Sequence, residues 1–478
     1  MADGLKERTA RGLMWGAINN LSSQILSVLT GIVLGRLLAP ADYGMVGMLT
    51  VFTAIAGTLQ DSGFTIALTN LKTATHKDYN AVFWFSTLMS VSLCGLLFLC
   101  APLIARFFHQ PELVSLSRLV FVSMVLSGLG VAHAACMFRN MMNRERAVTN
   151  FLALAGSGIV GITLALNGYS YWSLAWQQFV YMAIVDACRF YFVRWRPSLP
   201  IDFSPIRQMF GFSSKVLVTN VVNQVNGNLM SLVFARLFNA GAVGNYTQAA
   251  KWNQLGYSFI SGTLQQVAQP VLARVSSDEG RQLHVFRKML RFTAFGAMPS
   301  MFGLSLIAEF VVLLLGPQWT DSVPLLRILC VSGAFIPIHT LYQNLFLSQG
   351  RSDTYMWCTI AQIVALLLVV LLFSRWGIVP MVTAYSAVLV LWTGVWQLLA
   401  HRLTGLRHAD FLKDVLPFVV IAAVCMAAAY FLTRGIGQQI LLIVSRIVIA
   451  ALLYIIIMKI ANVRIFNECT QYILDKFK

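Results

Sequence analysis

The chain has 478 residues, of which 58% are hydrophobic and only 11% are charged, and its formal net charge is +17. This apolar excess excludes an ordinary soluble domain, in which about half of the residues would be apolar. The positive charge does not indicate nucleic-acid binding, because the basic residues are scattered through short loops and form no basic domain.

Fourteen segments are candidates for membrane-spanning helices, each of which needs ~20 mainly apolar residues. They occupy residues 12–35, 43–68, 80–104, 113–137, 147–167, 171–193, 210–235, 243–271, 292–315, 323–347, 354–374, 378–400, 412–433 and 439–460. The longest loops, 194–209 and 272–291, leave no room for an extramembrane catalytic domain. The sequence therefore predicts an all-α polytopic membrane protein with 14 transmembrane helices that is not an enzyme.

The distribution of lysine and arginine predicts the topology of these spans. Twenty-five basic residues lie in loops on the side of the N-terminus. The loops of the opposite side carry only Arg36, Arg106, Arg236, Arg375 and Arg434. Because basic loops are retained in the cytoplasm, both termini are predicted to be cytoplasmic.

The second half of the chain repeats the first. Matching positions include Asn20 and Asn220, Gln24 and Gln224, Gly44 and Gly244, and the tetrapeptide GTLQ at 57–60 and 262–265. Spans 1–6 therefore pair with spans 7–12 as two six-helix, pseudo-symmetric lobes of the same orientation. We predict an N-terminal lobe at residues 1–208, a C-terminal lobe at 209–408, and two additional helices, 13 and 14, with a cytoplasmic tail at 409–478.

Polar residues share one face of four predicted spans, two in each lobe. In the span 243–271, several glutamines fall within about 60° of Lys251 on a helical wheel. Amides facing lipid would be costly, so these faces predict a water-filled cavity. Interhelical hydrogen bonding is the alternative, although it needs only one or two amides. The predicted cavity residues are Asn20, Gln24, Gln60, Asn220, Asn223, Gln224, Gln248, Lys251, Gln254, Gln265 and Gln266.

Charged residues inside the spans are few, and each has two interpretations. Lys251 needs an anionic partner or water, since a lysine in the bilayer costs ~2.5–3.5 kcal/mol, unless it snorkels to an interface. The candidates for a basic mouth that meets phosphate are Lys215, Arg274 and Arg291, for which snorkelling or topology is the alternative.

Carboxylates are also scarce in the spans. Asp61 follows the repeated tetrapeptide and is the candidate for ion coupling. Asp186 precedes Arg189 by three residues, which predicts a structural ion pair on one helical face. Glu309 lies near the outer end of its span, where an interfacial position accounts for it. No cysteine or histidine spacing typical of a metal site is present, so neither a metal nor another cofactor is predicted.

Three segments around the first two spans resemble a known family. They are GLMWG at 12–16, GRLLAPADYG at 35–44 and QDSGF at 60–64. They are similar to motifs of the polysaccharide-exporter branch (O-antigen, capsule and exopolysaccharide flippases) of the multidrug/oligosaccharidyl-lipid/polysaccharide (MOP) superfamily. Fourteen spans and two six-helix lobes match this branch over the whole chain.

The resemblance implies a function in the bacterial inner membrane. A flippase of this branch translocates a polyprenyl-diphosphate-linked oligosaccharide, such as a lipopolysaccharide or exopolysaccharide repeat unit, by alternating access of two lobes around a polar, cationic central cavity. Its expected partners are the lipid-linked oligosaccharide and membrane lipid, with glycan polymerases and glycosyltransferases as candidate protein partners and a proton or sodium gradient as a candidate driving force.

Two other functions compete with this prediction. A cation-coupled multidrug antiporter of the same superfamily would rely on membrane carboxylates, whereas these spans contain few acids and many amides. A membrane glycan polymerase or ligase would need a large outer loop with catalytic residues, and the predicted outer loops are only a few residues long.

Overall fold

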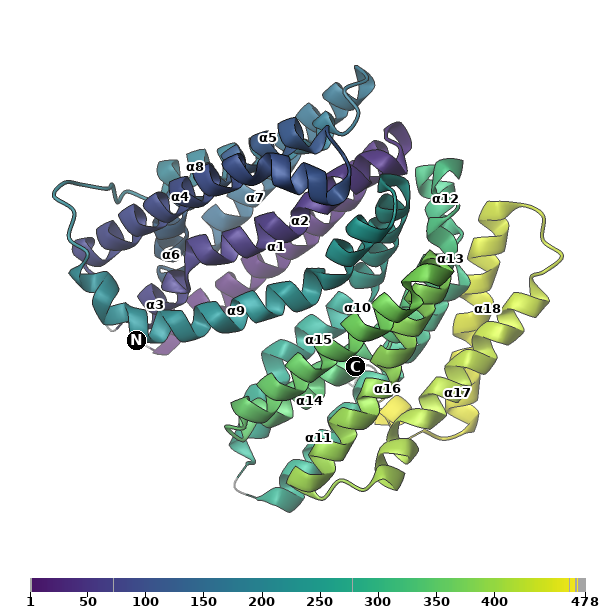
Figure 1. Cartoon of the computed structure of the whole chain (residues 1–478). Coiled ribbons are helices and arrows are strands. Elements are labelled where there is room, and N and C mark those ends of the chain that lie inside the picture. Colours follow the sequence, from purple (N-terminus) through teal and green to yellow (C-terminus); the bar gives the residue numbers. More distant parts are fainter. Residues whose placement is uncertain (1, 72, 277, 464, 469–470, 472–478) are drawn as a thin grey trace. The chain divides into compact units, whose positions relative to one another are not determined.

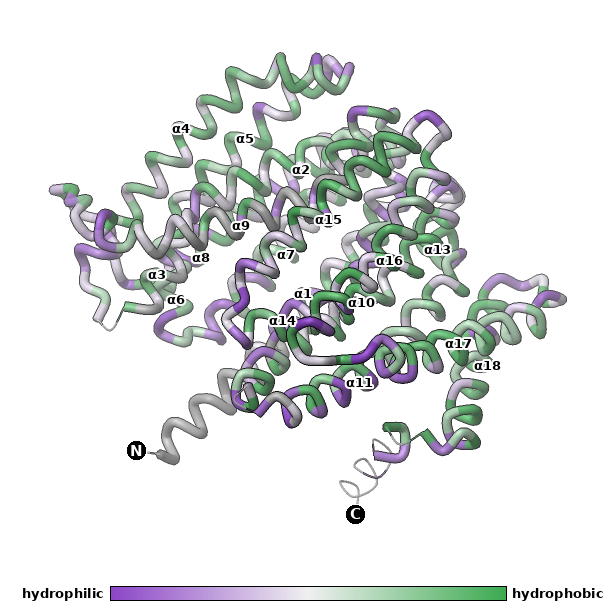
Figure 2. Tube along the Cα trace, turned by 60° about the horizontal axis from the view of Figure 1, so that its bottom comes forward, coloured by the Kyte–Doolittle hydropathy of each residue, from purple (hydrophilic) through white to green (hydrophobic). Residues whose placement is uncertain are grey.

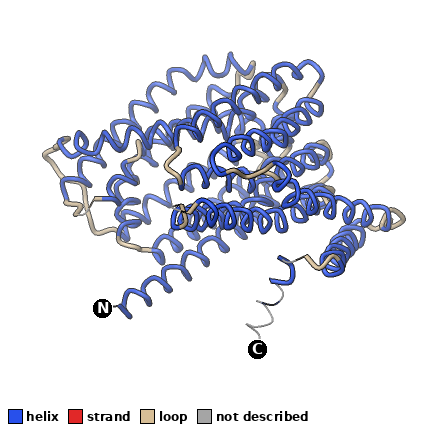
Figure 3. Tube along the Cα trace, turned by 90° about the horizontal axis from the view of Figure 1, so that it is seen from below, coloured by secondary structure: helices blue, strands red, loops and turns tan. Residues whose placement is uncertain are grey.

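A computed structural model of the protein describes the whole chain except residues 1, 72, 277, 464, 469–470 and 472–478. Within the helices, it does not describe the side chains of residues 2–13, 17–18, 66, 70, 212, 215–216, 218–219, 222–223, 225–226, 229–230, 266 and 279. All regular secondary structure in the described part is helical (Figures 1 and 3). The chain forms two compact units, Met1–Gly244 and Asn245–Lys478.

The first unit contains nine helices and the first turn of a tenth. They are α1 (Ala2–Leu37), α2 (Pro40–Asp61), α3 (Phe64–Asn70), α4 (His76–Phe108), α5 (Leu113–Leu129), α6 (Val131–Arg139), α7 (Asn143–Leu166), α8 (Trp172–Phe192), α9 (Ser204–Leu237) and the start of α10 (Ala240–Arg274). Helix α9, which opens the second sequence repeat, packs on α2, α3 and α4 of the first.

The second unit contains the rest of α10 and the remaining helices. They are α11 (Glu279–Leu306), α12 (Phe310–Leu315), the 3-10 turn η1 (Pro317–Trp319), α13 (Ser322–Gly333), α14 (Ile336–Ser348), α15 (Ser352–Phe373), η2 (Ser374–Trp376), α16 (Ile378–Thr404), α17 (His408–Leu432) and α18 (Gln439–Ile460). The lobes predicted at 1–208 and 209–408 were defined by the sequence repeat, whereas the two units are defined by compact packing. The division into lobes therefore stays a prediction.

Each predicted span coincides with a helix or a pair of helices. Within the described residues, nine helices are long and apolar enough to cross a membrane, or ten if the bent pair α5–α6 counts as one span. Helices α17 and α18, for example, are mostly apolar (Figure 2). The shortest of the four other long helices, α8 to α11, has 21 residues, which at 1.5 Å per residue still spans the ~30 Å hydrocarbon core. The protein is therefore an all-helical polytopic membrane protein.

The local sequence determines where α2 begins and ends. Pro40 opens the helix, where its missing N–H costs nothing, and the amide of Ala39 donates to Asp42 Oδ2 at 2.8 Å. The helix ends at Ser62 and Gly63, which have φ of 46° and 73°. Two consecutive left-handed residues break the helical hydrogen bonding, so the predicted continuous span 43–68 is divided into α2 and α3.

Three other predicted spans are also interrupted. The span 113–137 bends by 43° between α5 and α6, 292–315 is divided between α11 and α12, and 323–347 between α13 and α14. At Gly130, a β-carbon would lie 1.9 Å from Asp186 Oδ1, so only glycine admits the carboxylate of α8 at this bend. Hydropathy alone does not reveal such breaks, because the residues on both sides of them are apolar.

The last two helices, predicted as an addition to the repeats, are tied to α11. Helix α17 packs along α11, and α18 packs on both. Near one end of α11, Arg287 Nε donates to Asp414 Oδ2 of α17 at 2.7 Å. Beyond the other end, Arg446 Nη1 of α18 donates to Glu309 Oε2 at 3.1 Å. These charged contacts anchor the additional helices to the second unit at both ends.

Candidate functional site

A polar cavity of about 570 Å³ lies between α2 and α9 in the first unit. Its lining residues are Thr53, Ala54, Gly57, Thr58 and Asp61 from α2, and Asn220 and Gln224 from α9. The cavity thus joins three predicted site residues, Asp61, Asn220 and Gln224, which come from the two sequence repeats. Gly57 has open space within 4 Å of its β-carbon position, so its bare backbone helps to leave the cavity open.

The polar groups that remain available in this cavity are one carboxylate and two amides. Thr58 Oγ1 donates to Ala54 O at 2.9 Å and Thr53 Oγ1 to Thr50 O at 3.0 Å, so both hydroxyl hydrogens are used within α2. Asp61 Oδ1 accepts a hydrogen bond from Thr65 Oγ1. Since one oxygen of Asp61 is held by a neutral donor, the carboxylate can still receive a cation or a further donor.

On the α9 side, the two amides lie one helical turn apart. Asn228 Nδ2, one turn further on, donates to Gln224 O at 2.9 Å and lies 3.4 Å from Gln224 Oε1. This contact orients the Gln224 amide. Side-chain amides both donate and accept, so Asn220 and Gln224 offer the hydrogen-bonding groups that sugar hydroxyls require.

Three other residues predicted for the cavity in the first repeat lie elsewhere. Gln60 is only 1% exposed and is turned toward α5, where its Nε2 donates to Met124 O at 3.1 Å. Asn20 and Gln24 are exposed on α1 but do not line the α2–α9 cavity. Gln60 shares the helical face of Gly57, so the packing of α5 against this part of α2, and not the helical period, removes its amide from the cavity.

In the second unit, α10 presents an exposed polar face. Lys251, Gln254, Ser258 and Gln265 are all exposed along it. Gln248, in contrast, is 2% exposed and lies inside the unit. Among the described residues, no carboxylate forms an ion pair with Lys251. The predicted polar stripe of this helix is therefore accessible in this unit and carries an uncompensated cation.

The other predicted basic residues differ in their surroundings. Arg274 is exposed in the last turn of α10. Arg291 Nε lies 3.6 Å from Asp414 Oδ1 and shares this carboxylate with Arg287. The side chains of Lys215, Asn223 and Gln266 lie outside the described residues.

The structure confirms the one ion pair that the sequence predicted and contains others that were not predicted. The predicted pair is present, with Arg189 Nη1 3.1 Å from Asp186 Oδ1. The contacts of Arg446 with Glu309 and of Arg287 with Asp414 join residues more than 120 positions apart. Their only sequence signal is an isolated charge within or beside an apolar segment, which indicates a partner without identifying it.

Comparison with known proteins identifies the family. Residues 33–324 match the model of the family described as polysaccharide biosynthesis protein. The lipopolysaccharide biosynthesis protein WzxC of Escherichia coli K12 is 25% identical over 357 residues, which are 73% of this chain and 72% of WzxC. The succinoglycan biosynthesis transport protein ExoT of Rhizobium meliloti is 24% identical over 358 residues, 74% of this chain and 72% of ExoT.

Solved structures share the fold. The lipid II flippase MurJ in an inward closed conformation superposes with a TM-score of 0.76 and 16% identity, covering 94% of this chain and 98% of MurJ. An inward-facing multidrug resistance MATE family transporter of the MOP superfamily gives a TM-score of 0.62 and 14% identity, over 81% of this chain and 95% of that chain.

The nature of the protein follows from its spans and from these relatives. It is a multi-pass protein of the bacterial inner membrane, and its family consists of transporters rather than enzymes. The matched region covers more than half of the chain, from the end of the first span to the start of α13. The chain therefore belongs to the polysaccharide biosynthesis protein family.

Proposed function

We propose that the protein is a flippase that moves a polyprenyl-diphosphate-linked oligosaccharide from the cytoplasmic to the outer leaflet of the inner membrane. Relatives named for lipopolysaccharide and succinoglycan biosynthesis support a glycan-related cargo. The fold shared with a lipid II flippase supports a lipid-linked form of that cargo. Fourteen spans with both termini in the cytoplasm, and alternating access of two six-helix lobes, complete the proposal.

The observation that carries the proposal is the uncompensated cation on the amide-rich face of α10. Lys251 is exposed beside Gln254 and has no ion pair with a described carboxylate. A diphosphate would supply the missing negative charge, and charge-assisted hydrogen bonds are roughly twice as strong as neutral ones. The neighbouring amides would then hold sugar hydroxyls, as would Asn220 and Gln224 in the cavity of the first unit.

Ion coupling is assigned to Asp61 in this proposal. The carboxylate lines a cavity large enough for water and a cation and has one hydrogen bond from a neutral hydroxyl. Protonation or sodium binding there would change the charge of the cavity from negative to neutral. Such a change in charge would couple the proton or sodium gradient to the conformation in which the cavity accepts the substrate.

The decisive experiment follows the leaflet in which the lipid-linked oligosaccharide resides. On depletion of the protein, the oligosaccharide is expected to accumulate in the cytoplasmic leaflet, where an added periplasmic glycosidase or lectin cannot reach it. A drug antiporter would leave that distribution unchanged and would lower the efflux of a cationic dye such as ethidium. Normal oligosaccharide distribution together with lost dye efflux would replace the flippase assignment by the antiporter.

A further inference from the structure

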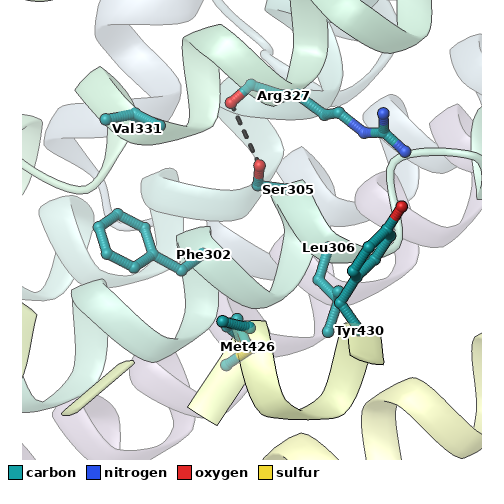
Figure 4. A pocket seen from close by; sticks show the side chains of 8 residues that line it. Phe302, Ser305, Leu306, Arg327, Val331, Met426 and Tyr430 are labelled. Atoms are coloured by element: carbon teal, nitrogen blue, oxygen red, sulfur yellow. Dashed lines mark hydrogen bonds between the residues drawn. The ribbon is translucent and has the colours of Figure 1, made fainter. Parts of the chain in front are cut away.

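A second, separate pocket of about 350 Å³ opens in the second unit between α11, α13 and α17. Figure 4 shows its side chains, which come from all three helices. Most of the wall is apolar and consists of Phe302, Leu306, Val331, Met426 and Ala427. The polar residues are Ser305, Arg327 and Tyr430, and Ser305 Oγ donates to the backbone oxygen of Arg327 at 3.2 Å.

The charges beside this pocket do not balance. Glu309 accepts from two arginines, through Oε2 from Arg446 Nη1 at 3.1 Å and through Oε1 from Arg327 Nη2. Arg446 is 5% exposed, and its Nη1 also donates to Leu306 O at 3.1 Å. The Arg327 side chain is 44% exposed. One positive charge therefore remains in excess, and it is accessible on Arg327.

Tyr430 adds a donor on the same side of the pocket. Its ring lies under the Arg446 guanidinium, 5.1 Å from centroid to Cζ, and this contact holds the ring in place. Figure 4 shows the Tyr430 hydroxyl and the Arg327 guanidinium at the same end of the pocket, with Leu306 beside Tyr430 and Phe302 and Val331 at the opposite end. The Tyr430 hydroxyl forms no hydrogen bond with another described residue, so it is available to a ligand.

The polar end of the pocket lies near the ends of two helices, where the membrane interface is expected. Arg327 is in the second turn of α13, and Tyr430 is two residues from the end of α17. Arginine and tyrosine at the ends of spanning helices are typical of the headgroup region. The topology predicted from the basic residues assigns these ends to the outer side.

We propose that this pocket binds one anionic phospholipid of the surrounding bilayer. Its phosphate accepts hydrogen bonds from the Arg327 guanidinium and the Tyr430 hydroxyl, and an acyl chain lies against Phe302, Leu306 and Met426. A single phosphodiester carries one negative charge, which matches the one positive charge in excess, whereas a diphosphate would leave the site negative. A zwitterionic lipid brings its own cation and gains less from Arg327.

Binding is measured on the full-length protein in detergent by native mass spectrometry, with dioleoyl phosphatidylglycerol and dioleoyl phosphatidylcholine as probes. The wild type is expected to retain one phosphatidylglycerol more tightly than any phosphatidylcholine. Because a charge-assisted contact is lost, Arg327→Gln is expected to weaken that binding by about tenfold. Arg327→Lys, which keeps the charge, is expected to restore most of it.

A second variant tests the pocket without touching the ion pair. Ala427 is exposed and lines the apolar wall, so Ala427→Trp fills the pocket and should displace the lipid while Arg327 and Glu309 keep their contact. Arg375→Gln is the matched control, because Arg375 is an exposed arginine of the second unit that does not line the pocket. Ala427→Trp also decides the case if Arg327→Gln does not fold.

Each result bears directly on the proposal. Equal retention of the two lipids, or equal loss in Arg375→Gln and Ala427→Trp, would overturn it. Competition of bound phosphatidylglycerol by millimolar inorganic phosphate alone would also overturn it, since the site would then hold a free anion. Selective loss in Arg327→Gln and Ala427→Trp, with no effect of free phosphate, would establish the lipid site.

Discussion

Gly44 and Gly244, which occupy the same position in the two sequence repeats, each lie against a backbone oxygen of the other repeat. A β-carbon on Gly44 would lie 1.8 Å from Ala240 O, and one on Gly244 would lie 1.7 Å from Pro40 O. Residues 40 and 240 are themselves equivalent, so the contact is reciprocal. The first turns of α2 and α10 approach backbone to backbone, and only glycine permits this distance.

A methyl group at either glycine should therefore separate these helix starts. Gly44→Ala or Gly244→Ala is expected to lower the free energy of unfolding by about 1–3 kcal/mol, the usual cost of overpacking. The thermal midpoint in detergent should fall accordingly.

Gly95→Ala is the matched control, because no heavy atom lies within 4 Å of its β-carbon position in α4. This substitution should leave stability unchanged or raise it slightly, since alanine favours a helix. If Gly244→Ala unfolds at the same thermal midpoint as the wild type, the two helix starts do not approach this closely in the purified protein.

Removing the charge of Asp414 should loosen the additional helices from α11. Asp414 is buried and contacts Arg287 through both oxygens, at 2.7 and 3.2 Å. Losing the charged hydrogen bonds to Asp414 should cost about 1.5–3 kcal/mol, since Arg287 is partly exposed and keeps its contact with Asp410. Asp414→Asn is thus expected to lower the thermal midpoint strongly.

Asp410 provides the comparison for this prediction. Its carboxylate lies 3.4 Å from Arg287 Nη1 and is more exposed, so Asp410→Asn should cost about 1 kcal/mol or less. Equal midpoints for the two variants would mean that burial does not determine the strength of this pair.

Lys251→Ala should impair transport without lowering the amount of protein in the membrane. If the ammonium contacts the diphosphate, its loss is expected to reduce flipping by roughly tenfold to a hundredfold, the effect of losing one charged hydrogen bond. The measurement is the appearance of lipid-linked oligosaccharide in the outer leaflet of proteoliposomes or cells. Lys459→Ala, at the exposed end of α18, is the control and should transport normally. Full activity of Lys251→Ala would remove this lysine from the substrate path.

Asp61→Asn should uncouple transport from the ion gradient. The amide keeps the shape of the carboxylate and can still accept from Thr65, but it cannot titrate or hold a cation by charge. An imposed proton or sodium gradient is expected to accelerate flipping by the wild type and not by this variant. Asp202→Asn, an exposed carboxylate before α9, should behave as the wild type. Equal acceleration of Asp61→Asn and the wild type would exclude Asp61 as the coupling residue.

Local information in the sequence sufficed for the helices and for contacts within one helix. The long apolar segments match helices in the structure, and the three-residue spacing of Asp186 and Arg189 gave their ion pair. The local sequence pattern also predicted the polar face of α10 around Lys251, because the 3.6-residue period alone decides which side chains share a face.

The same period does not decide what a face meets. Gln60 and Asp61 are adjacent in sequence, yet Gln60 is buried against Met124 of α5 while Asp61 lines the cavity with α9. A helical wheel separates the two side chains by 100°, but only the packing of neighbouring helices determines which direction is open.

The sequence by itself therefore determined the class of the protein, its helices, its repeat and its family resemblance, because hydropathy and helical periodicity are local properties. The tertiary structure alone decided that α9 encloses a cavity with α2, that Arg446 and Arg327 share Glu309, and that Gly44 and Gly244 meet the opposite repeat. Those contacts join residues from tens to about 200 positions apart, and their geometry depends on how the helices pack rather than on any local pattern of residues.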